Sequence, residues 1–387
     1  YLLQVLFLEK KIESLHITRS MQDRAKQLSE EIDEVNQRLD LIAKASNLSL
    51  QLYGWYIQHG HARNDDDRAI LDKMMQDPVL ATIKSSTGFY EQLYRFQCMC
   101  WHSFINQDFL MHYRYSQKWV DLYEANENMK TIETAQYIKG LHNLISAIFD
   151  LRNLPKFKDT IALLENFSEA PIVLNNKNNQ IQCFIYLYIA KINQHFLEGS
   201  FSEGLDMIPK MEEQLQEIEP FIDSHRVLVF YYKIACLYFG AGEPAKAIDY
   251  LNNIINWKLN LRDDLQCYAR LLHLIAHFEL GNMEVVNYLS KSVYRFMGKM
   301  DNLSTVEEVL FNFLKKMIQK YGRAGVAGIN KEELKLAFEE LLKILGPLEH
   351  NKLESRAFMY LDIISWLESR IQNKDVQTII KEKSAVK

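Results

Sequence analysis

Apolar residues recur every three or four positions along most of the chain, and this spacing predicts amphipathic helices. The first clear case is a seam of apolar residues at heptad spacing, formed by Met21, Ala25, Leu28, Ile32, Val35, Leu39 and Ile42. It predicts a long helix within an N-terminal helical segment at 1–50. This helix either pairs with another chain or forms an intramolecular antiparallel bundle with a helix near 47–59. The second arrangement is favoured because an apolar helix follows directly.

The remaining chain, 51–387, repeats one pattern of an apolar helix, a short turn and a second helix. The predicted turns lie 39 to 48 residues apart, at Gly60, Gln107, Pro155, Gly199, Gly242, Gly281 and Gly322. A last turn near Asn373 gives eight helix pairs. One pair cannot bury its apolar faces alone, so the pairs must stack. The polar segment 170–180 is the best candidate for a mobile loop between pairs.

The central turns share a pattern of side-chain sizes around them. Phenylalanine precedes three of them by three positions, as Phe196, Phe239 and Phe278, whereas Arg152 interrupts this row before Pro155. Small or β-branched residues follow the turns by five positions, which allows the second helix to approach the first closely. The spacing therefore predicts closely packed helix hairpins.

The segment 231–255 resembles a tetratricopeptide repeat. Tyr231 and Leu251 match its bulky positions, Tyr238 an aromatic one, and Ala235 and Ala247 the small positions where helices cross. The period averages nearly 44 residues instead of about 34, and it also fits the HEAT class of repeat. The resemblance is clearest over 135–300. It implies an all-α fold, an irregular tetratricopeptide-like solenoid preceded by the N-terminal helical segment.

In the resembled family, ligand peptides lie along the first helices of successive pairs, on the concave face. The positions of this chain that match such groove-facing positions include His142, Arg152, Asn193, Tyr232, Lys233 and Tyr268. Asn193 is of particular interest because a side-chain amide can hydrogen-bond both polar groups of an extended peptide. These six residues form the predicted peptide site.

Composition removes several other classes of protein. The net charge of −5 and the pI near 6.2 argue against a nucleic-acid partner. No apolar stretch reaches the roughly 20 residues that a membrane-spanning helix needs. The start of the chain is apolar but too short for a leader peptide, and it lacks a basic leader and a small-residue cleavage site. Five cysteines without framework spacing indicate reduced thiols and a cytoplasmic protein.

The motifs that could hold a metal or a cofactor are weak. Cys98 and His102 share a helix face, but Cys100 points nearly opposite, and no fourth ligand is near. His273 and His277 lack the glutamate of a zincin motif. The glycines at 322, 325 and 328 have no preceding strand and no Lys-Ser/Thr ending. We therefore expect no cofactor, no metal and no catalytic residues.

These observations predict a non-enzymatic scaffold or adaptor that binds a protein or peptide in a concave groove. One alternative is a peptide-responsive bacterial regulator, because the layout resembles that of the Rap phosphatases. A second is a subunit of a large assembly that associates through the N-terminal helix. A third is an all-helical enzyme, which would be marked by a deep pocket with several perturbed titratable groups.

Overall fold

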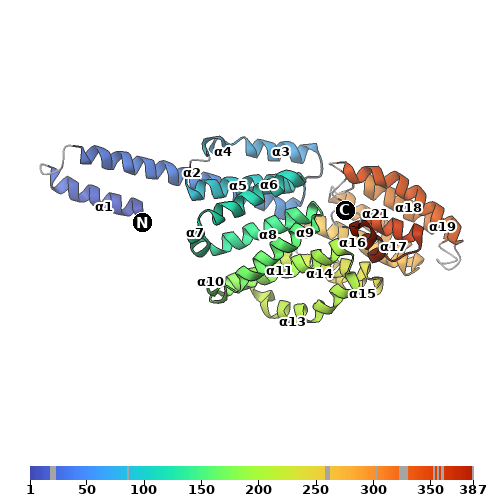
Figure 1. Cartoon of the computed structure of the whole chain (residues 1–387). Helices are drawn as coiled ribbons and strands as arrows, with labels where there is room; N and C mark the ends of the chain where they lie inside the picture. The colour runs from blue at the N-terminus through green and yellow to red at the C-terminus, as the bar shows by residue number, and fades with distance from the viewer. Residues whose placement is uncertain are drawn as a thin grey trace.

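The computed structural model of the chain describes all residues except 18–22, 85–86, 258–261, 301–302, 322–329, 352–353, 355–356, 359–360 and 386–387. Every regular element in this described part is helical, which confirms the all-α prediction (Figure 1). The α-helices are α1 (Leu2–Leu15), α2 (Arg24–His59), α3 (Asp65–Met75), α4 (Pro78–Thr82), α5 (Phe89–Ile105), α6 (Phe109–Glu124), α7 (Glu127–Ile132), α8 (Thr134–Asp150), α9 (Leu154–Ser168), α10 (Pro171–Leu174), α11 (Lys177–Glu198), α12 (Phe201–Gly204), α13 (Ile208–Ile218), α14 (Ser224–Gly240), α15 (Pro244–Ile255), α16 (Asp263–Glu279), α17 (Met283–Lys299), α18 (Thr305–Tyr321), α19 (Lys331–Leu345), α21 (Ile363–Gln372) and α22 (Val376–Ala385).

Most predicted turns lie where the backbone enters the left-handed region. Positive φ angles occur at Gly60, Gln107, Gly199, Gly242, Gly281 and Asn373, as expected for tight reversals. The predicted turn at Pro155 is wrong, because the residue with positive φ is Arg152. Pro155 instead lies in the first turn of α9, where a missing N–H is harmless. The predicted turn at Gly322 lies outside the described residues.

The helix pair α14–α15 is the clearest repeat. Ala235 and Ala247 are completely buried at the crossing of the two helices, as their size predicts. Gly240, near the end of α14, lies against the ring of Phe201 on α12, so consecutive pairs also approach closely. Small residues therefore set the spacing both within the pair and between pairs.

The hydrophobic core is divided along the chain in the way expected of stacked repeats. One cluster joins α2, α3, α4 and α5, a second runs from α5 to α14 and includes Ile380 of α22, and a third runs from α14 to α21. Each helix pair shares its apolar face with its neighbours in sequence. The predicted irregular solenoid is thus confirmed.

The N-terminal helices form a hairpin that projects from the solenoid (Figure 1). α2 is a single helix of 36 residues, so the predicted antiparallel pairing of its first half with a helix at 47–59 is wrong. Its first half packs against α1 instead, where Leu6 contacts Leu28 and Ile32. Met21 of the predicted seam lies outside the described residues. Because α2 continues through residue 50, the division of the chain there stays a proposal.

The segment 170–180 is ordered as helix and not as the predicted loop. It contains α10 and the start of α11, and the side chain of Asn176 accepts a hydrogen bond from the backbone N–H of Asn179. Asparagine is a favourable N-cap because its side chain satisfies an otherwise unpaired N–H. The polar residues that suggested a loop therefore begin a helix.

The solenoid curls until distant parts of the chain meet. Gly60, at the end of α2, lies against Asp264 of α16, and the guanidinium of Arg262 lies 4.9 Å from the ring centre of Tyr56. At the other end, α22 packs on α11, with Gly199 against the backbone at Gln377 and Lys381. The superhelix thus surrounds a central space that stays partly open to solvent. Within the described residues, no helix is both long and apolar enough to cross a membrane.

Candidate functional site

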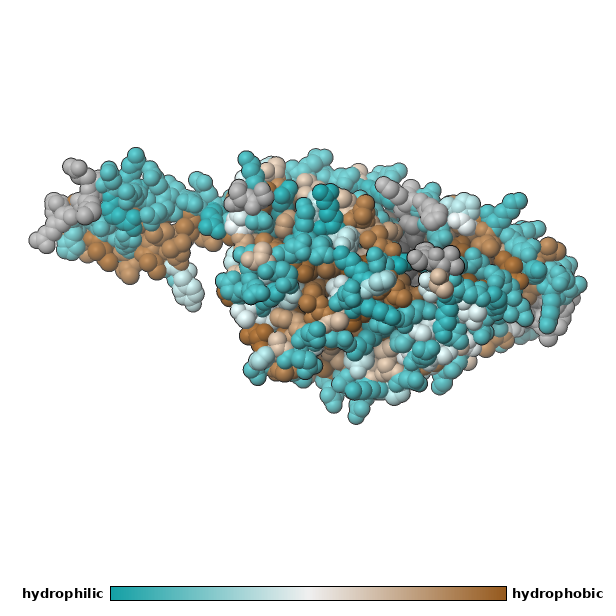
Figure 2. All heavy atoms as spheres, in the orientation of Figure 1, coloured by the Kyte–Doolittle hydropathy of each residue, from teal (hydrophilic) through white to brown (hydrophobic). Residues whose placement is uncertain are grey.

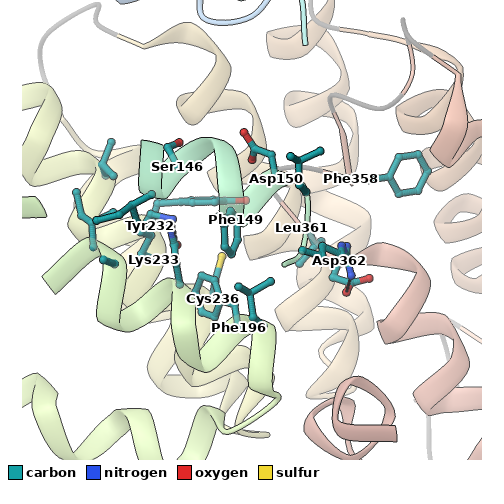
Figure 3. Close-up of a pocket in the computed structure, with 18 of the residues that line it drawn as sticks. Ser146, Phe149, Asp150, Phe196, Tyr232, Lys233, Cys236, Phe358, Leu361 and Asp362 are labelled. Carbon is teal, nitrogen blue, oxygen red and sulfur yellow. Dashed lines mark hydrogen bonds and ion pairs between the residues drawn. The ribbon is translucent and has the colours of Figure 1, made fainter. Parts of the chain in front are cut away.

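This partly open space is a cavity of about 1960 Å³, which we call the central cavity (Figure 3). Its wall is built from the inner helices of successive pairs, α2, α5, α8, α11 and α14, and is completed by α21 and α22. Pockets for small molecules usually measure about 300 to 1,000 Å³. The central cavity therefore has room for a larger ligand.

Five of the six predicted peptide-site residues line this cavity, namely His142, Arg152, Asn193, Tyr232 and Lys233. Tyr268 does not, since it is buried in the core of the C-terminal helices and its hydroxyl donates to Glu307 at 2.8 Å. The reason is that α16 packs against α14, α15 and α17, and only Leu265 near its start lines the cavity. The prediction that Tyr268 faces the groove is therefore wrong.

A row of phenylalanines, each three positions before a turn, follows the inner wall. Phe104, Phe149, Phe196 and Phe239 all line the cavity, and Phe149 takes its place in the row because the turn is at Arg152. Phe278, the next member, is buried in the core of the C-terminal helices. The row therefore gives the cavity an aromatic lining that ends at α16.

Lys233 of α14 lies between two of these rings. Its Nζ is 5.7 Å from the ring centre of Phe149 and 5.5 Å from that of Phe196, and it donates to Oδ1 of Asn193 at 2.6 Å (Figure 3). Burial lowers the pKa of Lys233 to about 8. The carbonyl of Asn193 is thus engaged by this lysine.

A second cation on α14 caps a stack of rings. The guanidinium of Arg226 lies 5.3 Å from the ring centre of Tyr186, which in turn stacks on His142 at 3.8 Å with nearly parallel planes. Burial, together with the charges of Arg226 and Lys139, lowers the pKa of His142 to about 3. His142 is therefore neutral at physiological pH.

Lys139 of α8 is the third cation of the wall. Its Nζ lies over two aromatic faces, 5.0 Å from the ring centre of Tyr53 and 5.5 Å from that of Trp101. Burial lowers its pKa, and the positive charge of Arg226 acts in the same direction. Cation–π contacts therefore stabilise ammonium groups that are largely withdrawn from water.

One carboxylate of the cavity wall also has a strongly shifted pKa. Burial raises the pKa of Asp150 to about 7, although the charge of Lys233 opposes this shift. Its Oδ2 lies 3.9 Å from Nδ1 of His112, whose own pKa falls to about 3 on burial. Neither of these two atoms has a hydrogen-bond partner in the described residues. Asp150 therefore changes charge near neutral pH.

The central cavity is deep and holds several titratable groups with shifted pKa values, which are the features expected of an enzyme's active site. Their arrangement provides no activated nucleophile in the described part of the chain. Lys233 is held by Asn193, and burial raises the pKa of the Cys236 thiol to about 12. The perturbations of Lys233, Asp150 and His142 have burial as their main cause.

The residues considered as metal ligands do not come together at one site either. Cys98 and Cys100 belong to different core clusters, and His102 is hydrogen-bonded to Asp72 at 2.8 Å. His273 and His277 make an edge-on ring contact at 4.6 Å. No group of three His, Cys, Asp or Glu residues suited to a metal occurs among the described residues.

Lys139, Tyr186, Arg226 and Asp150 were not among the predicted site residues. A signal for Lys139 and Asp150 exists on α8, where polar residues at 139, 142, 146 and 150 interrupt an apolar helix at intervals of three or four. Such a stripe places the polar side chains on one face. In a helix that packs on both sides, a polar stripe indicates a wall of a cavity.

Comparisons with known proteins agree with the fold. A crystal structure of a Rap protein complexed with competence and sporulation factor matches over 99% of both chains, with a TM-score of 0.54 and 12% sequence identity. Two structures of NprR also align, each with a TM-score of 0.49. One is in complex with its cognate peptide NprX, at 11% identity over 94% of this chain and 100% of that one. The other is the apo quorum sensor from B. thuringiensis, at 13% identity over 99% and 98%.

No family model matches the sequence, and no curated protein does. At this level of identity, the likeness to the Rap protein shows a shared fold. The chain has a tetratricopeptide-like helical-repeat fold, as the residues around Ala235 and Ala247 predicted.

Proposed function

We propose that this chain is a non-enzymatic scaffold or adaptor that binds a peptide, or a peptide segment of a protein, in its central cavity. The observation that carries this proposal is the cavity itself, about 1960 Å³ in volume and walled by the inner helices of successive repeats. Aromatic rings supply apolar contact, and a few polar side chains supply direction, as binding sites generally require. The shared fold with a Rap protein solved with a bound factor supports it. A cytoplasmic location stays a prediction.

The proposal is tested by the double variant Asn193→Ala/Lys233→Met. Removing both partners of one hydrogen bond leaves neither of them unpaired, so folding should be preserved. Immobilised full-length chain is incubated with a random library of synthetic linear peptides, and the retained peptides are sequenced by mass spectrometry. The variant should retain clearly fewer peptides at an unchanged melting temperature.

Lys210→Met is the matched control, because Lys210 is an exposed cation on α13 that does not line the cavity. It should retain peptides as the wild type does. A double variant that retains the same peptides in the same amount would contradict the proposed site.

A second candidate function, a sensor, is favoured by the continuity of α2. The end of this helix lines the cavity with Tyr53 and Tyr56, and its beginning forms the projecting hairpin with α1. A peptide that displaces the inner wall would therefore move the hairpin as a lever. Small-angle scattering separates the two functions, since a scaffold should keep its radius of gyration when peptide binds, whereas a sensor should change it.

A further inference from the structure

The wall formed by α8 and α14 carries more positive charge than its own carboxylates neutralise. Other cations around the cavity are paired: Arg152 with Asp362 at 3.7 Å, Arg262 with Asp264 at 2.8 Å, and Lys383 with Glu368 at 2.6 Å. Lys139, Arg226 and Lys233 instead contact aromatic rings, the Tyr186 hydroxyl and Asn193. Within the described residues, none of these three has a carboxylate at ion-pair distance.

The two nearest carboxylates do not neutralise the positive charge of these three cations. The carboxylate of Asp223 acts on the Arg226 guanidinium only through space, without a side-chain hydrogen bond. Asp150 acts on Lys233 in the same way, and its pKa of about 7 leaves it partly protonated at neutral pH. A cation withdrawn from water is costly unless an anion faces it, and an aromatic ring offsets only part of that cost.

Lys139 and Arg226 lie close enough to act on each other. The charge of Arg226 lowers the pKa of Lys139, and both charges lower the pKa of His142. Tyr186 connects the two, because its ring lies against Arg226 and its hydroxyl acts on Lys139. The two cations therefore form one positive region on the wall, with aromatic faces beneath both of them.

We propose that the central cavity selects peptides that carry a carboxylate, and that this carboxylate binds to Lys139 and Arg226. The inference rests on the proposed function, because it names the chemistry of the peptide bound in the same cavity. Arginine and lysine donate to a carboxylate in strong, charge-assisted hydrogen bonds. The carboxylate belongs either to the C-terminus of the peptide or to an Asp or Glu side chain.

The experiment offers full-length chain four matched libraries of random synthetic heptapeptides. They have a free C-terminal acid or a C-terminal amide, each with Asp and Glu either included or omitted. The wild type should retain amidated peptides without Asp or Glu at least about tenfold less well than the best of the other libraries. Retention that requires the free C-terminus identifies the terminal carboxylate, and retention that requires Asp or Glu identifies a side chain.

The variants Lys139→Met and Arg226→Met should each abolish this preference. Lys139→Arg keeps the charge and should keep the preference, while Lys210→Met should leave it unchanged. Melting temperatures show that the variants are folded. Because Lys139 has no anionic partner, Lys139→Met should not lower the melting temperature.

Two results would overturn the inference in distinguishable ways. If the wild type and Lys139→Met both retained peptides with and without carboxylates equally well, the carboxylate preference would be contradicted. The proposed peptide binding would not be affected by this result. If the wild type retained no peptide from any library, the proposed function would be contradicted. The inference, which rests on it, would then be contradicted as well.

Discussion

At the scale of single residues, the most informative feature is that buried titratable groups face the central cavity. Lys233 has a pKa of about 8 and Asp150 one of about 7, and the charge of each acts on the other. Both shifts have burial as their first cause, which disfavours the charged form of either group. The charge of this part of the wall therefore depends on pH near neutrality.

This dependence predicts that acidic peptides bind less tightly as the pH rises. Asp150 gains negative charge as the pH passes about 7, and Lys233 loses positive charge as it passes about 8. Both changes make the wall less positive, so the affinity for a peptide with Asp or Glu should fall by about tenfold between pH 6 and pH 9. Fluorescence anisotropy of a labelled peptide measures this.

The double variant Asp150→Asn/Lys233→Met provides the control, since neither replacement titrates in this range. Its affinity should vary much less with pH. A wild-type affinity that is constant from pH 6 to pH 9 would show that these two groups do not act on the ligand.

The predicted site residues show what a sequence reveals at this scale. Asn193 and Lys233 were found because inner-helix positions of a repeat face the groove wherever that face is open. Tyr268 occupies a first helix too, but α16 packs against α14, α15 and α17, and Tyr268 is buried in that core. Lys139 and Arg226 were missed because the cost of an unpaired cation becomes visible only when its surroundings are known.

At the scale of the elements, glycines determine how closely the helix pairs stack. A Cβ added at Gly240 would overlap the ring of Phe201, whereas one added at Gly54, in the last part of α2, meets nothing. Overpacking generally costs about 1 to 3 kcal/mol, and alanine in an exposed helix gains about 0.5 to 1 kcal/mol over glycine.

Gly240→Ala should therefore lower the free energy of unfolding by about 1 to 3 kcal/mol, whereas Gly54→Ala should raise it slightly. Urea unfolding followed by circular dichroism measures both. A Gly240→Ala variant as stable as Gly54→Ala would mean that the contact between α14 and α12 is not tight.

The turns were predicted well because their residues are locally specified. Gly199, Gly242 and Gly281 all adopt positive φ, which glycine tolerates. Pro155 misled the prediction because proline marks turns and helix starts alike. Arg152 adopts positive φ without being a residue type that favours it, so local sequence could not identify that turn.

The α1–α2 hairpin exposes a stripe of apolar side chains on α1 (Figure 2). Leu2, Val5, Leu8, Ile12 and Leu15 are each more than half exposed and recur every three or four residues, while Leu6 on the opposite side packs against α2. We propose that a second copy of the chain covers this stripe, because two hairpins packed face to face would form a four-helix bundle.

Light scattering after size exclusion should then show a dimer for the wild type and a monomer for Leu8→Asp/Ile12→Asp. Leu336→Asp is the control, since Leu336 is 58% exposed on the distant helix α19. It should remain a dimer. If the wild type were monomeric at every concentration, the proposal that a second copy of the chain covers the stripe would be contradicted.

At the scale of the whole molecule, closure of the superhelix creates the cavity. Gly60 meets Asp264, and Gly199 meets the backbone of α22, across more than 170 residues of sequence in each case. Repeat spacing describes only neighbouring pairs, so the sequence predicted a concave groove and could not predict that later helices would cover it. The length and curvature of the stack decide this together.

The central claim is that a carboxylate-bearing peptide lies inside this closed superhelix. The most direct test is a crystal structure of the full chain with a peptide enriched from the free-acid or Asp/Glu-containing libraries. We expect density along α8, α11 and α14, with a carboxylate of the peptide at Lys139 and Arg226. A peptide bound on the outer helices, or in the cavity with its carboxylates turned away from both cations, would contradict it.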